Sequence, residues 1–154
     1  MTENGARRSR ILPPTYLLVL IGVMVGLHFL LPLKALLTFP LTLVGLAPGL
    51  AGIALNLITD RAYKRHETTV NPFEASKALL TSGCFRFTRN PMYLGMSLFL
   101  LGLALFLGTL SPLLMVPVFP VMMEVIFIRP EEKMLEETFG EAYRDYKRRV
   151  RRWI

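Results

Sequence analysis

Long uncharged runs of apolar residues alternate with short charged runs along this chain. An α-helix crosses the hydrocarbon core of a bilayer with about 20 apolar residues, so runs of this kind are typical of membrane spans. Hydrophobic residues make up 53% of the 154 residues, and the mean hydropathy is +0.45 although the net charge is +7. A soluble domain of this size could not bury so much apolar sequence. The chain is therefore predicted to be a single integral membrane domain.

The predicted fold is all-α and polytopic, with about four transmembrane helices. The expected spans cover residues 16–33, 36–57, 92–107 and 113–128. The first apolar stretch, 13–33, is long enough to span and no small-residue cleavage site follows it, so it is read as a retained helix rather than a signal peptide. In this division, residues 13–58 hold spans one and two, and 92–128 hold spans three and four. Residues 1–12, 59–91 and 129–154 are the N-terminal segment, a polar loop and a charged tail.

The distribution of Lys and Arg predicts the orientation of the chain. Residues 1–12 hold three Arg, the loop from 60 to 91 holds six Lys or Arg, and the tail holds eight, whereas the two short turns hold only Lys34. Positively charged segments remain in the cytoplasm and contact anionic membrane lipids. Both termini, the loop and the tail are therefore expected on the cytoplasmic side, where loop and tail can build one site.

Several classes of partner and site are excluded by the same composition. No groove-reading or base-stacking element accompanies the basic residues, so no nucleic-acid partner is expected. Cys84 is the single cysteine, which rules out an intrachain disulfide. No metal site is predicted. The oligomeric state does not follow from the sequence.

Two sets of glycines predict close helix packing. Gly22 and Gly26 in the first span have the small-xxx-small spacing that lets helices approach each other. Gly45, Gly49 and Gly52 run along the second span, where they indicate tight packing or a kink.

The third span begins with a recognisable helix start. Asn90 is predicted at the N-cap, with its side-chain oxygen on a helix amide, and Pro91 at the first helical position. Unpaired amides and the positive end of the helix dipole suit an anion there, next to Arg89. The alternative is a well-capped helix that only enters the membrane.

Three acidic residues lie around the end of the fourth span. Glu124 is inside the span, where a carboxylate is costly and normally faces the bundle interior. The alternative places it shallow, paired with an Arg of the loop. Glu131 and Glu132 lie at the membrane boundary. One of them binds a cation there, or the two stabilise the following helix through its dipole, or they form ion pairs with nearby Arg. Glu124 and Glu131 share a face if the helix continues through Pro130.

The tail from residue 131 to 150 is predicted to form an amphipathic helix interrupted at Gly140. It lies on the membrane or caps the bundle. Its apolar positions recur every three or four residues, at Leu135, Phe139, Tyr143, Tyr146 and Val150.

Two motifs in this order resemble those of the isoprenylcysteine carboxyl methyltransferase family, within a broader set of integral membrane methyltransferases that includes the phospholipid N-methyltransferases. The resemblance covers about residues 68–153 and is typical of a short prokaryotic member, in a cytoplasmic membrane. The first motif is Ser82-Gly83-x-Phe85-Arg86-x-x-Arg89-Asn90-Pro91-x-Tyr93-x-Gly95, and the second is Glu131-Glu132-x-x-Leu135-x-x-x-Phe139-Gly140-x-x-Tyr143-x-x-Tyr146-x-x-x-Val150-x-Arg152-Trp153.

The resemblance implies S-adenosyl-L-methionine as cofactor and transfer of its methyl group. Glu131 matches the glutamate that binds the methionine end of this cofactor, so it is expected to pair with the ammonium group. Arg89 and the start of the third span are expected to hold the cofactor's carboxylate, and an aromatic ring is expected to lie against its sulfonium. The residues implied in cofactor binding are Lys77, Ala78, Leu79, Leu80, Phe85, Asn90, Pro91, Met92, Tyr93, Glu131, Glu132 and Tyr143. Arg89, Asn90 and Tyr93 are expected to position the reacting groups.

The acceptor is expected to be lipophilic, a small molecule or a lipidated substrate that enters from the bilayer. The family's prenyl-cysteine enzymes have His at the position of Asn90 and a substrate-binding Arg at the position of Phe127. Arg129 stands two residues after Phe127 and is the substrate-binding candidate here, with Glu124 as a second contact. A carboxylate, amine or thiol acceptor all remain open.

Two other functions are alternatives for a chain with this pattern of spans. A small four-helix transporter would use Glu124 as its intramembrane carboxylate, but it would also predict polar residues in several spans. A structural membrane protein without a site would not need the polar loop and the acidic pair on one side. Both leave the two motifs unexplained.

Overall fold

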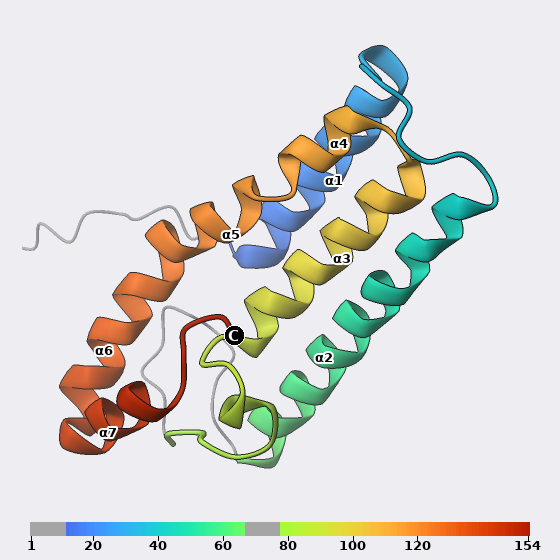
Figure 1. Ribbon diagram of the computed structural model, residues 1–154. Helices are drawn as coiled ribbons and strands as arrows, with labels where there is room; N and C mark the ends of the chain where they lie inside the picture. Colours follow the sequence, from blue (N-terminus) through green and yellow to red (C-terminus); the bar gives the residue numbers. More distant parts are fainter. Residues whose placement is uncertain (1–11, 67–77) are drawn as a thin grey trace, which may run out of the picture.

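The computed structural model describes residues 12–66 and 78–154, and the prediction of an all-α fold is confirmed. Figure 1 shows α1, α2, α3 and the α4–α5 part of a long helix lying side by side, with α6 extending beyond them and α7 folded back at the end of α6. In the described ranges, extended pairing is limited to one isolated bridge between Ala35 and Thr109. The helical elements are α1 (Pro13–Leu30), η1 (Leu41–Gly45), α2 (Leu46–Arg65), η2 (Gly83–Arg86), α3 (Pro91–Leu107), α4 (Leu110–Met115), α5 (Val118–Met123), η3 (Glu124–Ile128), α6 (Arg129–Phe139) and α7 (Glu141–Arg149).

Three of these helices are long and apolar enough to cross a membrane: Pro13–Leu30, Leu41–Arg65 and Leu110–Phe139. The fourth, α3, is apolar but has 17 residues. The exact number of four spans therefore stays a prediction. The boundaries of the first and third spans agree with the predicted ones to within three residues.

The second span starts later than predicted. Instead of a helix from residue 36, the chain is extended over 34–37 and hydrogen-bonds the turn before α4. The amides of Leu36 and Leu37 donate to the carbonyl of Gly108 at 2.8 and 3.0 Å, and Leu110 donates to Lys34 at 2.9 Å. Proline lacks the amide that a helix interior needs, so Pro40 ends up at the N-cap of η1 rather than inside the span.

The fourth span and the first part of the tail form one continuous helix, which was predicted as two elements. The junction is η3, a π-helical turn in which the amide of Arg129 bonds to the carbonyl of Glu124. Pro130 follows directly and cannot donate a backbone hydrogen bond. A wider turn at this point lets the helix pass the proline without breaking. Gly140 then ends α6, and its positive φ of 53° turns the chain into α7.

Glycines bring α2 and α3 into backbone contact, which confirms the predicted close packing of the second span. A Cβ on Gly52 would lie 2.4 Å from the carbonyl oxygen of Gly95, and one on Gly45 would lie 2.3 Å from that of Gly102. The prediction for the first span is wrong, because nothing described lies within 4 Å of a Cβ built on Gly22 or Gly26.

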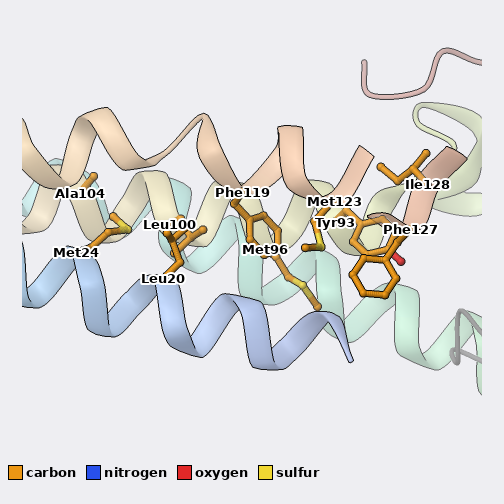
Figure 2. Close-up of a cluster of buried hydrophobic side chains, with 10 residues drawn as sticks. All are labelled: Leu20, Met24, Tyr93, Met96, Leu100, Ala104, Phe119, Met123, Phe127 and Ile128. Carbon is orange, nitrogen blue, oxygen red and sulfur yellow. The ribbon is translucent and has the colours of Figure 1, made fainter. Parts of the chain in front are cut away.

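The remaining interior packs between α1, α3 and the α5–η3 part of the long helix (Figure 2). At one end of this cluster Phe127 stacks on Tyr93, with ring centroids 6.4 Å apart, and meets the edge of Tyr16 at 5.7 Å. The position where the prenyl-cysteine enzymes have Arg thus carries a buried aromatic ring in this chain. The other buried members are Leu20, Met24, Met96, Leu100, Ala104, Phe119, Met123 and Ile128.

Candidate functional site: the loop, α3 and the tail

The tail packs against the loop before α3. Its predicted apolar positions face one way: Tyr143 and Tyr146 are buried together with Leu80 and Phe85, and Leu135, Phe139 and Val150 pack around them. The hydroxyl of Tyr146 donates to the backbone oxygen of Phe85 at 2.7 Å. This cluster supports the predicted capping arrangement, in which α7 covers the loop. It also brings the two sequence motifs together.

The last residues of the chain then cross the start of α3. The backbone oxygen of Arg152 accepts hydrogen bonds from the Thr88 hydroxyl at 3.1 Å and from the Asn90 amide group at 2.9 Å. The backbone amide of Arg89 donates to the oxygen of Arg151 at 3.0 Å. We call residues 150–154 the closing segment. It holds the loop and the start of α3 in one place.

Asn90 occupies the predicted N-cap position of α3, and Pro91 the first turn. The predicted side-chain cap is wrong, because Asn90 makes no capping hydrogen bond and instead reaches the closing segment. The first amides of a helix have no partner within the helix. Since no side chain caps α3, these amides remain suited to an anion.

Glu131 faces α3, where its Oε1 accepts a hydrogen bond of 2.7 Å from the Tyr93 hydroxyl. Within the described ranges, no Lys or Arg nitrogen forms an ion pair with Glu131, although five other Glu of this chain have one. The site therefore contains a carboxylate whose charge is not balanced by a neighbouring cation. Such a group suits a cationic ligand.

Glu132, the next residue, is only 7% exposed and has arginine partners. Arg152 donates to both of its oxygens, from Nε at 3.0 Å and from Nη2 at 2.8 Å. Arg89 approaches the same carboxylate, with Nη1 3.2 Å from Oε1. The two neighbouring glutamates thus differ: Glu132 is held inside an ion-pair group, and Glu131 is not.

Arg89 is the buried cation of the site. Its side chain is 9% exposed, yet its Nε and Nη1 have no hydrogen-bond partner among the described residues. Buried polar atoms are normally hydrogen-bonded, so unused donors on a buried guanidinium point to a ligand that accepts hydrogen bonds. Arg89 also lies beside Tyr143. Burial and the charge of Glu132 raise the pKa of Tyr143 to about 12, with Arg89 opposing them.

Glu124 is paired, which agrees with the shallow alternative, but its partners are not in the loop. Its Oε1 lies 3.1 Å from Arg129 Nη2 and 2.8 Å from Arg152 Nη1. Trp153 Nε1 lies 3.4 Å from its Oε2. The π turn and the returning tail bring these partners to it, and neither was foreseen.

The register prediction for the acidic residues is also wrong. Arg152 binds Glu124 and Glu132 together, so the shared face joins positions eight apart rather than Glu124 and Glu131. A π turn contains an extra residue relative to an α turn, which displaces the following positions by one. Consequently Glu131 points to Tyr93 on α3, away from this ion-pair group.

The other predicted residues lie in or near this region, with one exception. Leu80 and Phe85 are buried and Leu79 packs against them, while Met92 packs on the interior cluster. Ala78 is half-buried in a bend. Lys77 lies outside the described residues. The roles assigned to these residues remain predictions.

Three contributors were missed as site residues. Tyr63, in the last turns of α2, meets the edge of the Phe85 ring with centroids 5.6 Å apart, and it lies within electrostatic range of Glu131. Thr88 and Arg152 hold the closing segment. Arg152 was part of the matched motif, so a signal existed for it. No signal in the sequence distinguished Tyr63 from the other residues near the end of the span.

A family model and a curated protein match parts of this chain. A family model described as phospholipid methyltransferase matches residues 40–142. A curated protein of Haemophilus influenzae (strain ATCC 51907 / DSM 11121 / KW20 / Rd), described as an uncharacterized protein, is 43% identical over 63 residues, which is 41% of this chain and the whole length of that protein. The family match covers well over half of the chain and includes α2, α3 and α6. The chain therefore belongs to the phospholipid methyltransferase family and is an integral membrane methyltransferase.

Proposed function

We propose that this protein transfers a methyl group from S-adenosyl-L-methionine to a lipophilic acceptor held in the membrane. The observation that carries the proposal is that, within the described ranges, one site contains a carboxylate without a cationic partner and a buried guanidinium with donors that make no hydrogen bond. Glu131 has no cationic partner among the described residues, and Arg89, across the same site, has donors without acceptors. A zwitterionic amino-acid group would satisfy both at once.

The residues present fit such a cofactor. Glu131 would take the ammonium group, held in place by the hydroxyl of Tyr93. Arg89 and the uncapped amides at the start of α3 would take the carboxylate. When bound, S-adenosyl-L-methionine supplies a methyl group activated by a positively charged sulfur. The rings of Tyr93 and Phe85, on α3 and in the loop, are the aromatic faces proposed to lie against that charge.

Methyl transfer requires alignment of donor and acceptor more than proton transfer. The site is built for alignment, because helices and the closing segment hold its charged groups from several directions. Arg89 and Asn90 are fixed through the closing segment, and Tyr93 is fixed by Phe127 and Glu131. These three residues are proposed to position the reacting groups.

The acceptor is proposed to approach from the membrane, along the long helix. Val125 and Ile126 on η3 are exposed apolar residues, and Arg129 follows them one turn later, 63% exposed. A lipophilic molecule lying on this surface would bring its polar end to Arg129 and Glu124, next to the site. The transporter reading gains no support, because Glu124 already has two arginine partners.

Binding of S-adenosylhomocysteine, measured by calorimetry on the detergent-purified protein, tests the proposal. We expect micromolar affinity for the wild type and no measurable binding for Glu131→Ala, because the ammonium loses its partner. Glu137→Ala, on the same helix with a side chain 68% exposed, is the matched control and should bind normally.

A folded wild-type protein that does not bind would contradict the proposed function. Normal binding by Glu131→Ala would show that the assignment of the ammonium site is wrong.

A further inference from the structure

Arg152 joins three parts of the molecule, two through its guanidinium and one through its backbone oxygen. It binds both oxygens of Glu132 on α6 and, through Nη1 at 2.8 Å, Oε1 of Glu124 on η3. Its backbone oxygen is meanwhile held by Thr88 and Asn90 at the start of α3. An arginine with its side chain and backbone fixed on separate elements has little freedom to move.

We infer that Arg152 is a positioning residue of the methyl-transfer site, which binds Glu132 and Glu124 and thereby leaves Arg89 available to the cofactor. This inference rests on the proposed function. Arg152 itself is not assigned any contact with cofactor or acceptor. It would act through the carboxylates that it holds.

Arg152 and Arg89 compete for Glu132. This carboxylate is buried, and a buried carboxylate needs a cationic partner. Arg89 stands next to it, with Nη1 3.2 Å from Oε1 and with unused donors. If Arg152 were absent, Glu132 would draw Arg89 closer, to the ~2.8 Å of a charge-assisted hydrogen bond. The donors proposed to hold the cofactor carboxylate would then be occupied by the protein itself.

The charges at the site agree with this division. Glu124 and Glu132 share the guanidinium of Arg152, and Glu124 also has Arg129. Glu131, adjacent in sequence to Glu132, turns to Tyr93 instead. Glu131 and Glu132 are successive residues of α6 and point in different directions. Glu132 therefore joins the ion-pair group of Arg152, and Glu131 stays outside it.

A double-mutant cycle tests the inference, with S-adenosylhomocysteine affinity as the readout. Arg152→Gln should weaken binding at least about tenfold, equal to a loss of about 1.4 kcal/mol. Glu132→Gln/Arg152→Gln should bind nearly as well as Glu132→Gln alone, because a neutral residue 132 no longer captures Arg89. Arg152→Lys should rescue part of the loss, since it keeps the charge but not the two-pronged geometry.

A role limited to holding the structure together predicts the opposite result. The double variant would then bind no better than Arg152→Gln, and that outcome would overturn the inference. Arg151→Gln is the matched control, because the Arg151 side chain is exposed. Its backbone oxygen accepts the hydrogen bond from the Arg89 amide, and either Arg or Gln at position 151 provides that oxygen.

The two proposals fail in different ways. If the wild type does not bind S-adenosylhomocysteine, the proposed function is wrong. If the wild type binds and Arg152→Gln binds with the same affinity, the proposed function stands and the role of Arg152 is refuted. Thermal unfolding of each variant is measured together with binding. If Arg152→Gln alone does not fold, the double variant still gives an answer, because it removes both Arg152 and the charge of Glu132 and so leaves no unpaired buried carboxylate at position 132.

Discussion

At the scale of single residues, the site is defined by which charges are paired. Glu131 and Glu132 are neighbours in sequence with the same chemistry, yet only Glu132 is held by arginines. Arg89 and Arg152 both approach Glu132, and buried donors of Arg89 have no hydrogen-bond partner in the part of the chain that the structure describes. These differences carry the assignment of a zwitterionic ligand.

Tyr93→Phe tests the best-defined polar contact of the site. The substitution removes the hydroxyl that donates to Glu131 and leaves the ring stacked on Phe127. A hydrogen bond to a charged group contributes about 1.5–3 kcal/mol, so thermal unfolding in detergent should show a clear loss of stability. Tyr16→Phe, which contacts Phe127 by its ring edge, is the control. Equal unfolding temperatures for the two variants would show that this hydrogen bond is unimportant.

At the scale of elements, two features decide how the helices meet. Glycines on α2 and α3 let the backbones touch, and the π turn at η3 carries the long helix past Pro130. The first was visible in the sequence as spaced glycines. The second was not, because a hydrophobicity pattern does not distinguish an α turn from a π turn of one more residue. That single residue decides which glutamate faces Tyr93.

Gly52→Ala tests the contact between α2 and α3. The new Cβ would lie 2.4 Å from the backbone oxygen of Gly95, so the helices must separate, and overpacking of this kind costs about 1–3 kcal/mol. Gly22→Ala on α1 meets nothing within 4 Å and should be neutral or stabilising by up to about 1 kcal/mol. Unfolding in graded detergent mixtures measures both. A stable Gly52→Ala beside a destabilised Gly22→Ala would contradict the packing described here.

At the scale of the whole molecule, the loop, the start of α3 and the tail meet at one end of the bundle, as Figure 1 shows. The count of positive residues predicts that this end is cytoplasmic. The opposite end holds the extended segment paired with the turn before α4. The orientation of these two ends is a prediction that labelling can test.

Single cysteines in a Cys84→Ser background test the orientation. Thr38→Cys, at the end opposite the site, should react with a membrane-impermeant maleimide added to intact cells. Glu137→Cys, exposed on α6, should react only after the cells are opened. Both positions are solvent-exposed, so the difference reports the side of the membrane. The reverse labelling pattern would place the site outside and refute the predicted topology.

Composition and periodicity alone were sufficient for the all-α membrane fold, the apolar helices predicted at residues 16–33 and 92–107, and the amphipathic character of the tail. These properties depend on local runs of apolar residues, because each run must match the bilayer or cover a neighbouring surface wherever it lies. The motif resemblance led to the methyltransferase family. The tertiary structure alone decided how the polar side chains are paired: Asn90 with the closing segment, Glu124 and Glu132 with Arg152, and Glu131 with Tyr93. Ion pairs depend on register to within one residue, and the register here was set by the π turn and by the return of the last residues across α3, neither of which leaves a local pattern in the sequence.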